Sequence, residues 1–139
     1  MTTQRTLCII KPDACEKRKQ GAILQRLLDE GFQLLGMKQL RLSTAQAEGF
    51  YAVHKERPFY RDLCSFMTRS AVVVLALAGE DAVAHLRSVI GATDPAKADL
   101  GTIRKLFGSN MSENAVHGSD SEQNGLIECA YFFAESELR

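Results

Sequence analysis

Apolar residues along the chain follow two periods, and these periods predict where strands and helices lie. Continuous apolar runs with β-branched residues over 6–10 and 71–79 are typical of strands buried on both faces. Residues 32–42 alternate as a half-buried strand does, but the alternation slips near Gly36, which indicates a β-bulge. A short stretch over 114–117 completes a set of four predicted strands.

Helical spacing of apolar residues predicts helices between these strands. The predicted helices cover residues 21–31, 44–54, 58–67, 80–91 and 121–132. Two capping boxes are expected at helix starts, formed by Ser43 with Gln46 and by Ser119 with Glu122. Residues 92–113 show no clear period, and a loop of that length inside a folded domain favours a functional role.

The order of the elements is strand, helix, strand, helix, strand, helix, loop, strand, helix. This order predicts an α/β sandwich of the ferredoxin-like kind, in which a four-stranded antiparallel sheet is covered by helices. A chain of 139 residues has the length of one domain, so we expect residues 1–139 to form a single domain.

Composition narrows the range of functions. Apolar residues make up 45% of the chain and charged residues 24%, which is ordinary for a globular protein. Lys plus Arg number 17 and Asp plus Glu number 17, and this zero net charge argues against general electrostatic binding to nucleic acid or membranes. The four cysteines form no Cys-x-x-Cys pair, and the chain shows neither a signal-peptide core nor an apolar run of membrane-spanning length. We therefore expect a cytoplasmic protein with reduced thiols.

The stretch AVHGSDS, residues 115–121, places His117 between a strand and the start of a helix. Helix N-termini offer free N–H groups and the positive end of the helix dipole, and both favour a phosphate group. A neutral imidazole there is able to attack phosphorus if an acceptor such as Glu128 fixes its second nitrogen. The alternative is that His117 is a turn residue with a satisfied hydrogen bond.

Three cations lie where sites of α/β proteins are commonly found. Lys11 ends the first strand, Arg87 lies late in a helix and Arg104 lies in the long loop. They either converge on phosphate oxygens or are separate solvated surface charges. The chain has no G-x-G-x-x-G motif and no protein-kinase signature, and the Walker-like glycines of GFQLLGMK lie within a predicted strand. If the protein transfers a phosphoryl group, its active site is therefore of a kind other than these three motifs.

Aromatic residues around position 55 leave a similar choice open. Phe59 and Leu63 are one helical turn apart and could clamp a flat base, but such a pair is also typical of a core. Tyr51 and His54 share a face of the preceding predicted helix, and the same two interpretations apply to them.

Four segments together resemble the nucleoside diphosphate kinase family over nearly the whole chain. The segments are RTLCIIKPDA, GFYAVHKERPFY, LRSVIGATDPAKADLGTIR and NAVHGSDS. The last is similar to the active-site signature of the family, Asn-x-x-His-Gly-Ser-Asp-Ser. Their presence in this order favours a catalytic role for His117 over the turn residue.

The resemblance implies a ping-pong transfer of the terminal phosphoryl group from a nucleoside triphosphate, mainly ATP, to nucleoside diphosphates through a phosphohistidine at His117. It implies that Ser119 and Glu128 orient the histidine and that Lys11 takes part in catalysis. The phosphates and the sugar are expected to contact Lys11, Tyr51, His54, Arg87, Thr93, Arg104, Asn114 and Gly118. The base is expected to stack on Phe59, with Leu63 and Met111 on the opposite wall.

The resemblance also implies the cofactor and the partners. Mg²⁺ is expected to arrive with the nucleotide and to bridge its phosphates, without a dedicated protein site. The family forms dimers that assemble into tetramers or hexamers, so a homo-oligomer is expected. No stable binding to nucleic acid or membranes is expected.

Three positions depart from the wording of the family. Arg69 and Ser70 stand where the family often has Ser-Gly-Pro, which indicates a structural variation, and Met111 replaces a more usual β-branched residue or leucine. One alternative function is a catalytically silent nucleotide-binding or protein-interaction module on the same fold. Another is a ferredoxin-like RNA-binding domain, but its sheet would need exposed aromatic residues and a basic balance.

Overall fold

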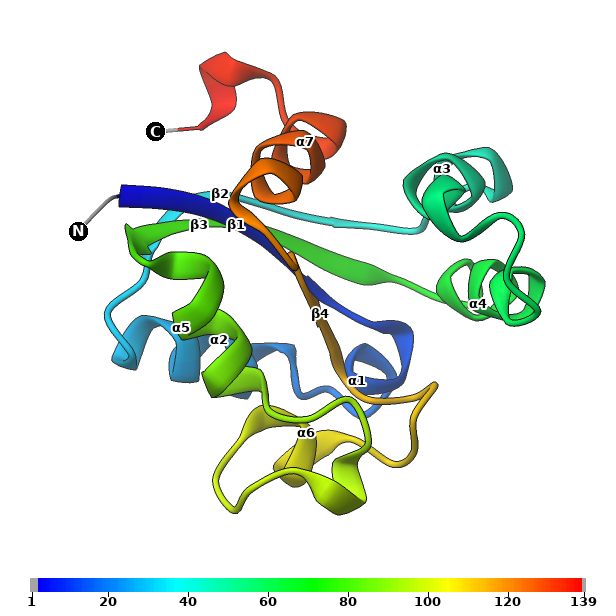
Figure 1. The fold of residues 1–139 in the computed structure, drawn as a ribbon, viewed down its shortest axis with the longest axis horizontal. Helices are drawn as coiled ribbons and strands as arrows, with labels where there is room; N and C mark the ends of the chain where they lie inside the picture. Colours follow the sequence, from blue (N-terminus) through cyan, green and yellow to red (C-terminus); the bar gives the residue numbers. More distant parts are fainter. Residues whose placement is uncertain (1–2, 139) are drawn as a thin grey trace.

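The sheet is built around the first strand of the chain. In the computed structural model, which describes residues 3–138, β1 (Thr3–Ile10) pairs antiparallel with β3 (Val72–Glu80) and with β4 (Val116–Gly118). β2 (Gln33–Leu40) pairs antiparallel with the other edge of β3, which gives the order β2-β3-β1-β4. This order confirms the predicted ferredoxin-like sheet (Figure 1).

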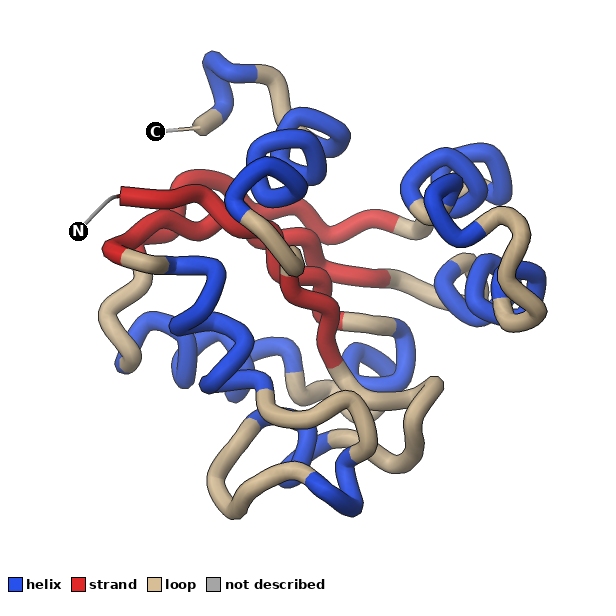
Figure 2. The backbone as a smooth tube through the Cα atoms, in the orientation of Figure 1, coloured by secondary structure: helices blue, strands red, loops and turns tan. Residues whose placement is uncertain are grey.

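Helices cover both faces of the sheet, so the molecule has three layers (Figures 1 and 2). α2 (Gln20–Asp29) and α5 (Ala82–Ile90) lie against one face, and α7 (Glu122–Phe132) lies against the other. α3 (Thr44–Phe50) and α4 (Tyr60–Met67) form a helical hairpin beyond one end of the sheet.

Two apolar clusters hold the layers together, and β1 contributes to both. Its side chains alternate between the two faces of the sheet, as the pleat of a strand requires. Cys8 and Ile10 join the cluster beneath α2 and α5, whereas Leu7 and Ile9 join the cluster beneath α7. Because β1 is buried on both faces, its end has a fixed position. The chain segment that begins at Lys11 is therefore fixed in position as well.

Shorter helices connect these elements. They are α1 (Pro12–Glu16), η1 (Ala52–His54), η2 (Pro95–Lys97), α6 (Ile103–Phe107) and η3 (Glu135–Glu137), where η marks a 3-10 helix. Within the described part of the chain, no helix has both the length and the apolar character needed to cross a membrane.

Two local sequence predictions are confirmed. The register of β2 against β3 shifts between Leu34 and Gly36, where the bulge was expected. Ser43 and Gln46 form the capping box of α3: Ser43 Oγ accepts from Gln46 N–H at 3.1 Å, and Gln46 Oε1 accepts from Ser43 N–H at 2.9 Å.

Several predicted boundaries are wrong, mostly where a segment is short. Pro12, which follows the strand predicted over 6–10, is the first residue of α1, a position where its missing N–H costs nothing. The segment 92–113 was expected to be irregular, yet it contains η2 and α6. The helix expected over 44–54 ends at Phe50 and continues as η1, and α4 begins at Tyr60 rather than at Pro58.

The capping box expected from Ser119 and Glu122 does not form. Ser121 is the N-cap of α7, and its Oγ accepts from Asn124 N–H at 3.0 Å. Ser119 lies on the β1 side of this turn, where its Oγ accepts from Leu7 N–H at 3.0 Å. Ser119 is therefore hydrogen-bonded to the sheet, and Ser121 caps α7.

Candidate active site

His117 is held at the edge of the sheet by the central strand. It lies in β4 opposite Ile9 of β1, and Gly118 follows it opposite Cys8. A Cβ on Gly118 would lie 2.8 Å from Ile90 Cδ1, so the Ile90 side chain of α5 would have to move. The glycine after His117 therefore allows α5 to pack directly behind the histidine.

The imidazole of His117 is oriented by a carboxylate. Its Nε2 lies 2.8 Å from Glu128 Oε1, and the same oxygen accepts from Ser119 Oγ at 2.7 Å. The His117 and Glu128 side chains are 20% and 19% exposed, so both are largely withdrawn from water. Because a carboxylate only accepts, Nε2 carries the hydrogen and Nδ1 presents its lone pair. This arrangement leaves Nδ1 as the nitrogen available for chemistry.

Lys11 is buried at the end of β1, the strand that pairs with β4. Its Nζ donates to Asn114 Oδ1 at 2.8 Å, and Asn114 Nδ2 in turn donates to Thr93 O at 3.0 Å and to Met111 O at 3.1 Å. Burial, with a smaller effect of the charge on Arg104, lowers the pKa of Lys11 to about 8. An anion placed beside Lys11 would restore the charged form that burial disfavours.

Arg104 and Arg87 face a small cavity on the α5 side. The cavity, of about 120 Å³, is lined by Arg87, Ile90, Gly91, Ala92, Thr93, Arg104 and Gly118. Arg104 donates to Gly91 O at 3.2 Å and to Val116 O at 2.9 Å, while its buried Nε has no partner among the described residues. Burial and the neighbouring Arg87 lower the pKa of Arg104 to about 10, so it remains charged at neutral pH. The predicted cations thus converge, although Arg104 comes from a helix rather than from a loop.

A strained residue joins the Lys11 segment to β4. Ala115 has φ of +75°, in the left-handed region that residues with a Cβ rarely adopt. Its N–H donates to Asp13 Oδ2 at 3.1 Å, and its carbonyl accepts from Lys11 N–H at 2.8 Å. Burial raises the pKa of the Asp13 carboxyl. Local strain of this kind persists where surrounding contacts determine the conformation, and it is concentrated at functional sites.

Aromatic rings extend from the histidine into the α3–α4 hairpin. The Tyr51 and His117 ring centroids are 6.5 Å apart, those of Tyr51 and His54 are 6.5 Å apart, and those of His54 and Phe59 are 5.5 Å apart. The buried Tyr51 hydroxyl has no partner among the described residues, and burial together with the Glu128 carboxylate raises the pKa of Tyr51 well above its usual value. Phe59, at the end of this row, is 49% exposed and has a free face for a flat ligand.

The two residues expected to oppose Phe59 are less clearly placed. Leu63 lies one turn further along α4 and is partly buried against the apolar cluster beneath α7. The side chain of Met111 is 61% exposed in the loop before β4. That Leu63 and Met111 face Phe59 across a bound base stays a prediction of the sequence.

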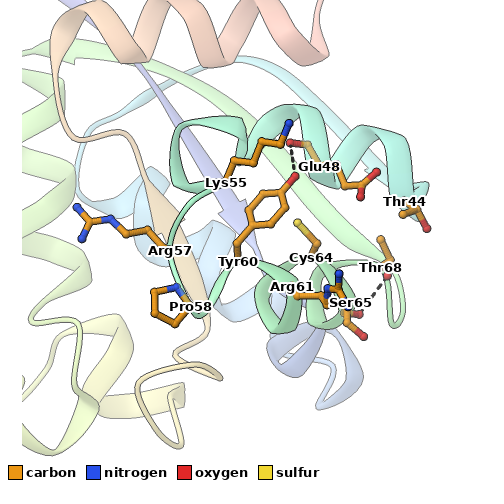
Figure 3. Close-up of a pocket in the computed structure, with 10 residues that line it drawn as sticks. All are labelled: Thr44, Glu48, Lys55, Arg57, Pro58, Tyr60, Arg61, Cys64, Ser65 and Thr68. Atoms are coloured by element: carbon orange, nitrogen blue, oxygen red, sulfur yellow. Dashed lines mark hydrogen bonds between the residues drawn. The ribbon is translucent and has the colours of Figure 1, made fainter.

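A larger groove lies away from all these residues. It has a volume of about 680 Å³ and runs between α3 and α4, where Tyr60 crosses it and donates through its hydroxyl to Glu48 O at 3.1 Å (Figure 3). None of the predicted site residues lines it. The Tyr60 bond ties the two helices of the hairpin together.

Two residues near the centre were not singled out from the sequence. Asp13 fixes Ala115, as described above, and the Phe50 ring packs edge-on against the His117 ring with centroids 5.4 Å apart. Asp13 follows directly after Lys-Pro, and Phe50 directly precedes Tyr51. The sequence places both residues next to a predicted site residue. That adjacency does not show which neighbouring side chains point into the site.

A metal site made by the protein is not evident. Over residues 3–138, no group of three or more His, Cys, Asp or Glu side chains is arranged to hold a metal ion. The Glu128 carboxylate is already engaged by His117 and Ser119, and the other polar side chains gathered here are cations, an amide and hydroxyls, which donate to anionic oxygens.

The fold and the site together define a class of protein. A histidine with a free Nδ1, at the sheet edge beside buried cations, is an arrangement suited to carrying a phosphoryl group. Comparison with known proteins agrees: the family model described as "Nucleoside diphosphate kinase" matches residues 4–138. The chain belongs to the nucleoside diphosphate kinase family.

Individual relatives are similar over their full lengths. A nucleoside diphosphate kinase of Sorangium cellulosum is 58% identical, covering 99% of this chain and 96% of the relative. One from Geobacter sulfurreducens is 55% identical, covering 97% and 98% respectively. The crystal structure of the Aquifex aeolicus enzyme has 41% identity and a TM-score of 0.97, covering 99% of this chain and 100% of the other.

A further solved relative carries a nucleotide. The Halobacterium salinarum nucleoside diphosphate kinase in complex with CDP is 36% identical with a TM-score of 0.94, covering 99% of this chain and 92% of that one. The predicted family and the predicted enzyme class, a nucleoside diphosphate kinase, are confirmed by these comparisons.

Proposed function

We propose that the protein transfers the terminal phosphoryl group of a nucleoside triphosphate, mainly ATP, to nucleoside diphosphates, with His117 as the covalent carrier. The observation that carries the proposal is the hydrogen bond from His117 Nε2 to Glu128 Oε1, which leaves Nδ1 free beside Lys11 and the Arg87–Arg104 cavity. The match of the whole chain to the family supports the same reaction.

The reaction has two balanced half-steps. The Nδ1 lone pair attacks the γ-phosphorus, the bond from phosphorus to the β–γ bridging oxygen breaks, and the diphosphate leaves with that electron pair. The proton stays on Nε2, and Glu128 stabilises the positive charge that develops on the ring. In the second half-step a terminal oxygen of another diphosphate attacks the same phosphorus, and Nδ1 recovers its electron pair.

The cationic residues position and neutralise the phosphates. Phosphoryl transfer needs placement and charge stabilisation more than covalent machinery. We assign the phosphates and the sugar to Lys11, Tyr51, His54, Arg87, Thr93, Arg104, Asn114 and the Gly118 amide, as the resemblance implies. We assign the base to Phe59, with Leu63 and Met111 opposite. Stacking reads only the flat face of a base, so purine and pyrimidine diphosphates are both expected as acceptors.

Mg²⁺ is proposed to belong to the nucleotide. The donor set near His117 consists of cations, amides and hydroxyls, which fits phosphate oxygens that already share a metal ion. When bound, the ion supplies charge neutralisation between phosphate oxygens.

Assembly and location complete the proposal. We propose homodimers that assemble into tetramers or hexamers, because β2 ends the sheet and presents an edge to which another strand can add. A cytoplasmic location and the absence of stable nucleic-acid or membrane binding remain predictions of the sequence.

Labelling without an acceptor tests the proposed function. The protein is incubated with γ-labelled ATP and Mg²⁺, and the label on the protein is then followed. It is expected to survive base, to leave in acid and to move to any added diphosphate, while His117→Ala binds nucleotide but takes up no label. Label on Ser119 or Ser121, or equal labelling of His117→Ala, would refute the mechanism. Binding without labelling of the wild type would favour the silent module.

A further inference from the structure

An ion cluster outside the proposed catalytic centre joins three elements that surround it. Arg69 follows α4, and its guanidinium donates from Nε to Glu16 Oε2 at 3.0 Å and from Nη2 to Glu16 Oε1 at 2.7 Å. Nη2 also donates to Glu113 Oε1 at 3.1 Å. Ser70 Oγ donates to Glu16 Oε2 at 2.6 Å, so the residues that depart from the family wording are both engaged.

The three elements are the ones that carry the proposed nucleotide ligands. α4 begins beside Phe59, and Arg69 lies at its other end, where the guanidinium packs over the Phe66 ring at 4.9 Å. Glu16 ends α1, which begins directly after Lys11. Glu113 directly precedes Asn114, whose side chain holds Lys11 Nζ. Arg69 therefore links the wall formed by Phe59 and α4, on which Leu63 also lies, to the wall formed by the loop that carries Met111 and to the segment that begins at Lys11.

The loop before β4 is stiff enough to transmit this link. Asn110 Oδ1 accepts from the N–H groups of Ser112 and Glu113, at 3.0 and 2.9 Å, and Ser109 N–H donates to Glu113 O at 2.8 Å. Lys17 Nζ adds a second tie from beyond α1, to Ser109 Oγ at 2.9 Å. A shift of Glu113 would therefore move the whole loop, including Met111.

We propose that Arg69 is a positioning residue that sets the separation of the two walls of the nucleotide site. The inference rests on the proposed function. The cluster touches neither His117 nor Glu128, whose contacts are with β1, the α3 rings and Ser119. Its effect is therefore on nucleotide binding, which appears in KM, and not on the chemical step, which appears in kcat.

The forked geometry explains why arginine suits this role. A single exposed ion pair contributes little, but here one planar guanidinium makes a bidentate pair with one carboxylate and reaches a second carboxylate. Lysine offers a point charge and cannot keep both partners in a fixed plane. The lysine variant is therefore a graded test and not a neutral replacement.

The test compares Arg69 with another forked arginine of the same protein. Arg5 makes a bidentate pair with Glu135 at 3.0 and 2.9 Å, at the far end of β1. Four quantities are measured: KM and kcat for a nucleoside diphosphate acceptor, the Kd for ADP by calorimetry, and the Tm. The variants are Arg69→Gln, Arg69→Lys, Glu113→Gln and the double variant that combines Arg69→Gln with Glu113→Gln. The control is Arg5→Gln.

The expected pattern is a rise in KM and Kd without loss of kcat. Arg69→Gln and Glu113→Gln should each raise KM about threefold to fivefold with kcat changed less than about twofold, and Arg69→Lys should fall between them and the wild type. The double variant should be no worse than the more affected single variant, because both remove one link. Arg5→Gln should leave KM unchanged even if its Tm falls.

Each other outcome counts against a stated claim. If Arg69→Gln and Arg69→Lys keep the wild-type KM and Kd, the positioning role is wrong, whatever their Tm. If kcat falls while KM holds, the cluster acts on the chemistry and the inference is wrong. A wild type that binds ADP but transfers no phosphate contradicts only the proposed function, since the Kd series still tests Arg69. A wild type that does neither overturns both.

Discussion

The Oε1 atom of Glu128 accepts two hydrogen bonds, from His117 and from Ser119, and this determines what a substitution there should do. Glutamine keeps the shape but removes the negative charge, and its amide can turn its NH₂ group toward the ring. We expect Glu128→Gln to lower kcat about 10- to 100-fold without abolishing transfer, because orientation weakens while the nucleophile remains. Steady-state kcat and the rate of phosphohistidine formation measure this effect.

Glu122→Gln provides the matched control for that experiment, because Glu122 lies on the same helix and is exposed. It should leave kcat within about twofold, as surface substitutions generally do. Equal losses of kcat in both variants would mean that kcat depends on the total charge of α7 and not on the hydrogen bond between Glu128 and His117.

The lowered pKa of Lys11 predicts that the protein captures nucleotide less efficiently at alkaline pH. Burial and Arg104 lower its pKa from 10.5 to about 8 in the empty site, so the charged form is lost as pH rises through that value. A neutral amine attracts phosphate poorly, so kcat/KM should fall above about pH 8. Bound phosphates favour the ammonium, so kcat itself should hold to higher pH. A kcat/KM profile that stays flat to about pH 10 would contradict this assignment.

The residues of the candidate site divide by how much the sequence could say about them. His117, Lys11 and Asn114 occur in motifs whose order along the chain implies a shared site. A hydrogen bond joins Lys11 to Asn114, and His117 lies in the strand that pairs with β1. Asp13 and Phe50 act through buried contacts with residues distant in sequence, and no local pattern reveals such contacts.

At the scale of elements, the start of α3 offers a test of local stability. Ser43→Ala removes one half of the capping box and leaves a helix N–H without its acceptor. We expect a loss of about 1 kcal/mol in the free energy of unfolding, seen as a Tm lower by about 3 °C at fixed protein concentration. Ser65→Ala is the control, because Ser65 is exposed inside α4, where alanine is the better helix former. A Tm drop in the control equal to that of Ser43→Ala would remove the evidence for the cap.

Long elements could be predicted from the sequence, and short ones could not. β3 and α2 are long enough for an apolar period to repeat, and both were placed within one or two residues of their true ends. α1 and α6 have five residues each, less than two helical turns, so no period can establish itself. The choice between Ser119 and Ser121 as the cap depended on Leu7, more than one hundred residues away in sequence.

At the scale of the whole molecule, the free edge of β2 is where assembly can be tested. Met37 lies on this strand with 51% of its surface exposed, so it offers an apolar side chain to a partner that adds at this edge. We expect the wild type to sediment as a dimer or a larger symmetric assembly and Met37→Glu to shift toward smaller species. Ile127→Lys, at a similarly exposed apolar position on α7, is the control and should not change the distribution. A wild type that stays monomeric at micromolar concentration would refute the proposed assembly.

The central position of β1 also determines when the sheet can form while the chain is being synthesised. Residues 3–10 emerge first from the ribosome, yet their partners are residues 73–80 and 116–118. Pairing across such long loops must overcome closure entropy, so a sheet of this kind folds more slowly than a bundle of neighbouring helices. The nascent strand therefore stays without its sheet partners while most of the chain is translated, a period when exposed strand edges invite misassembly. The imidazole proposed as nucleophile docks only with β4, and its carboxylate arrives with α7, so the oriented pair of His117 and Glu128 is among the last features of the fold to form.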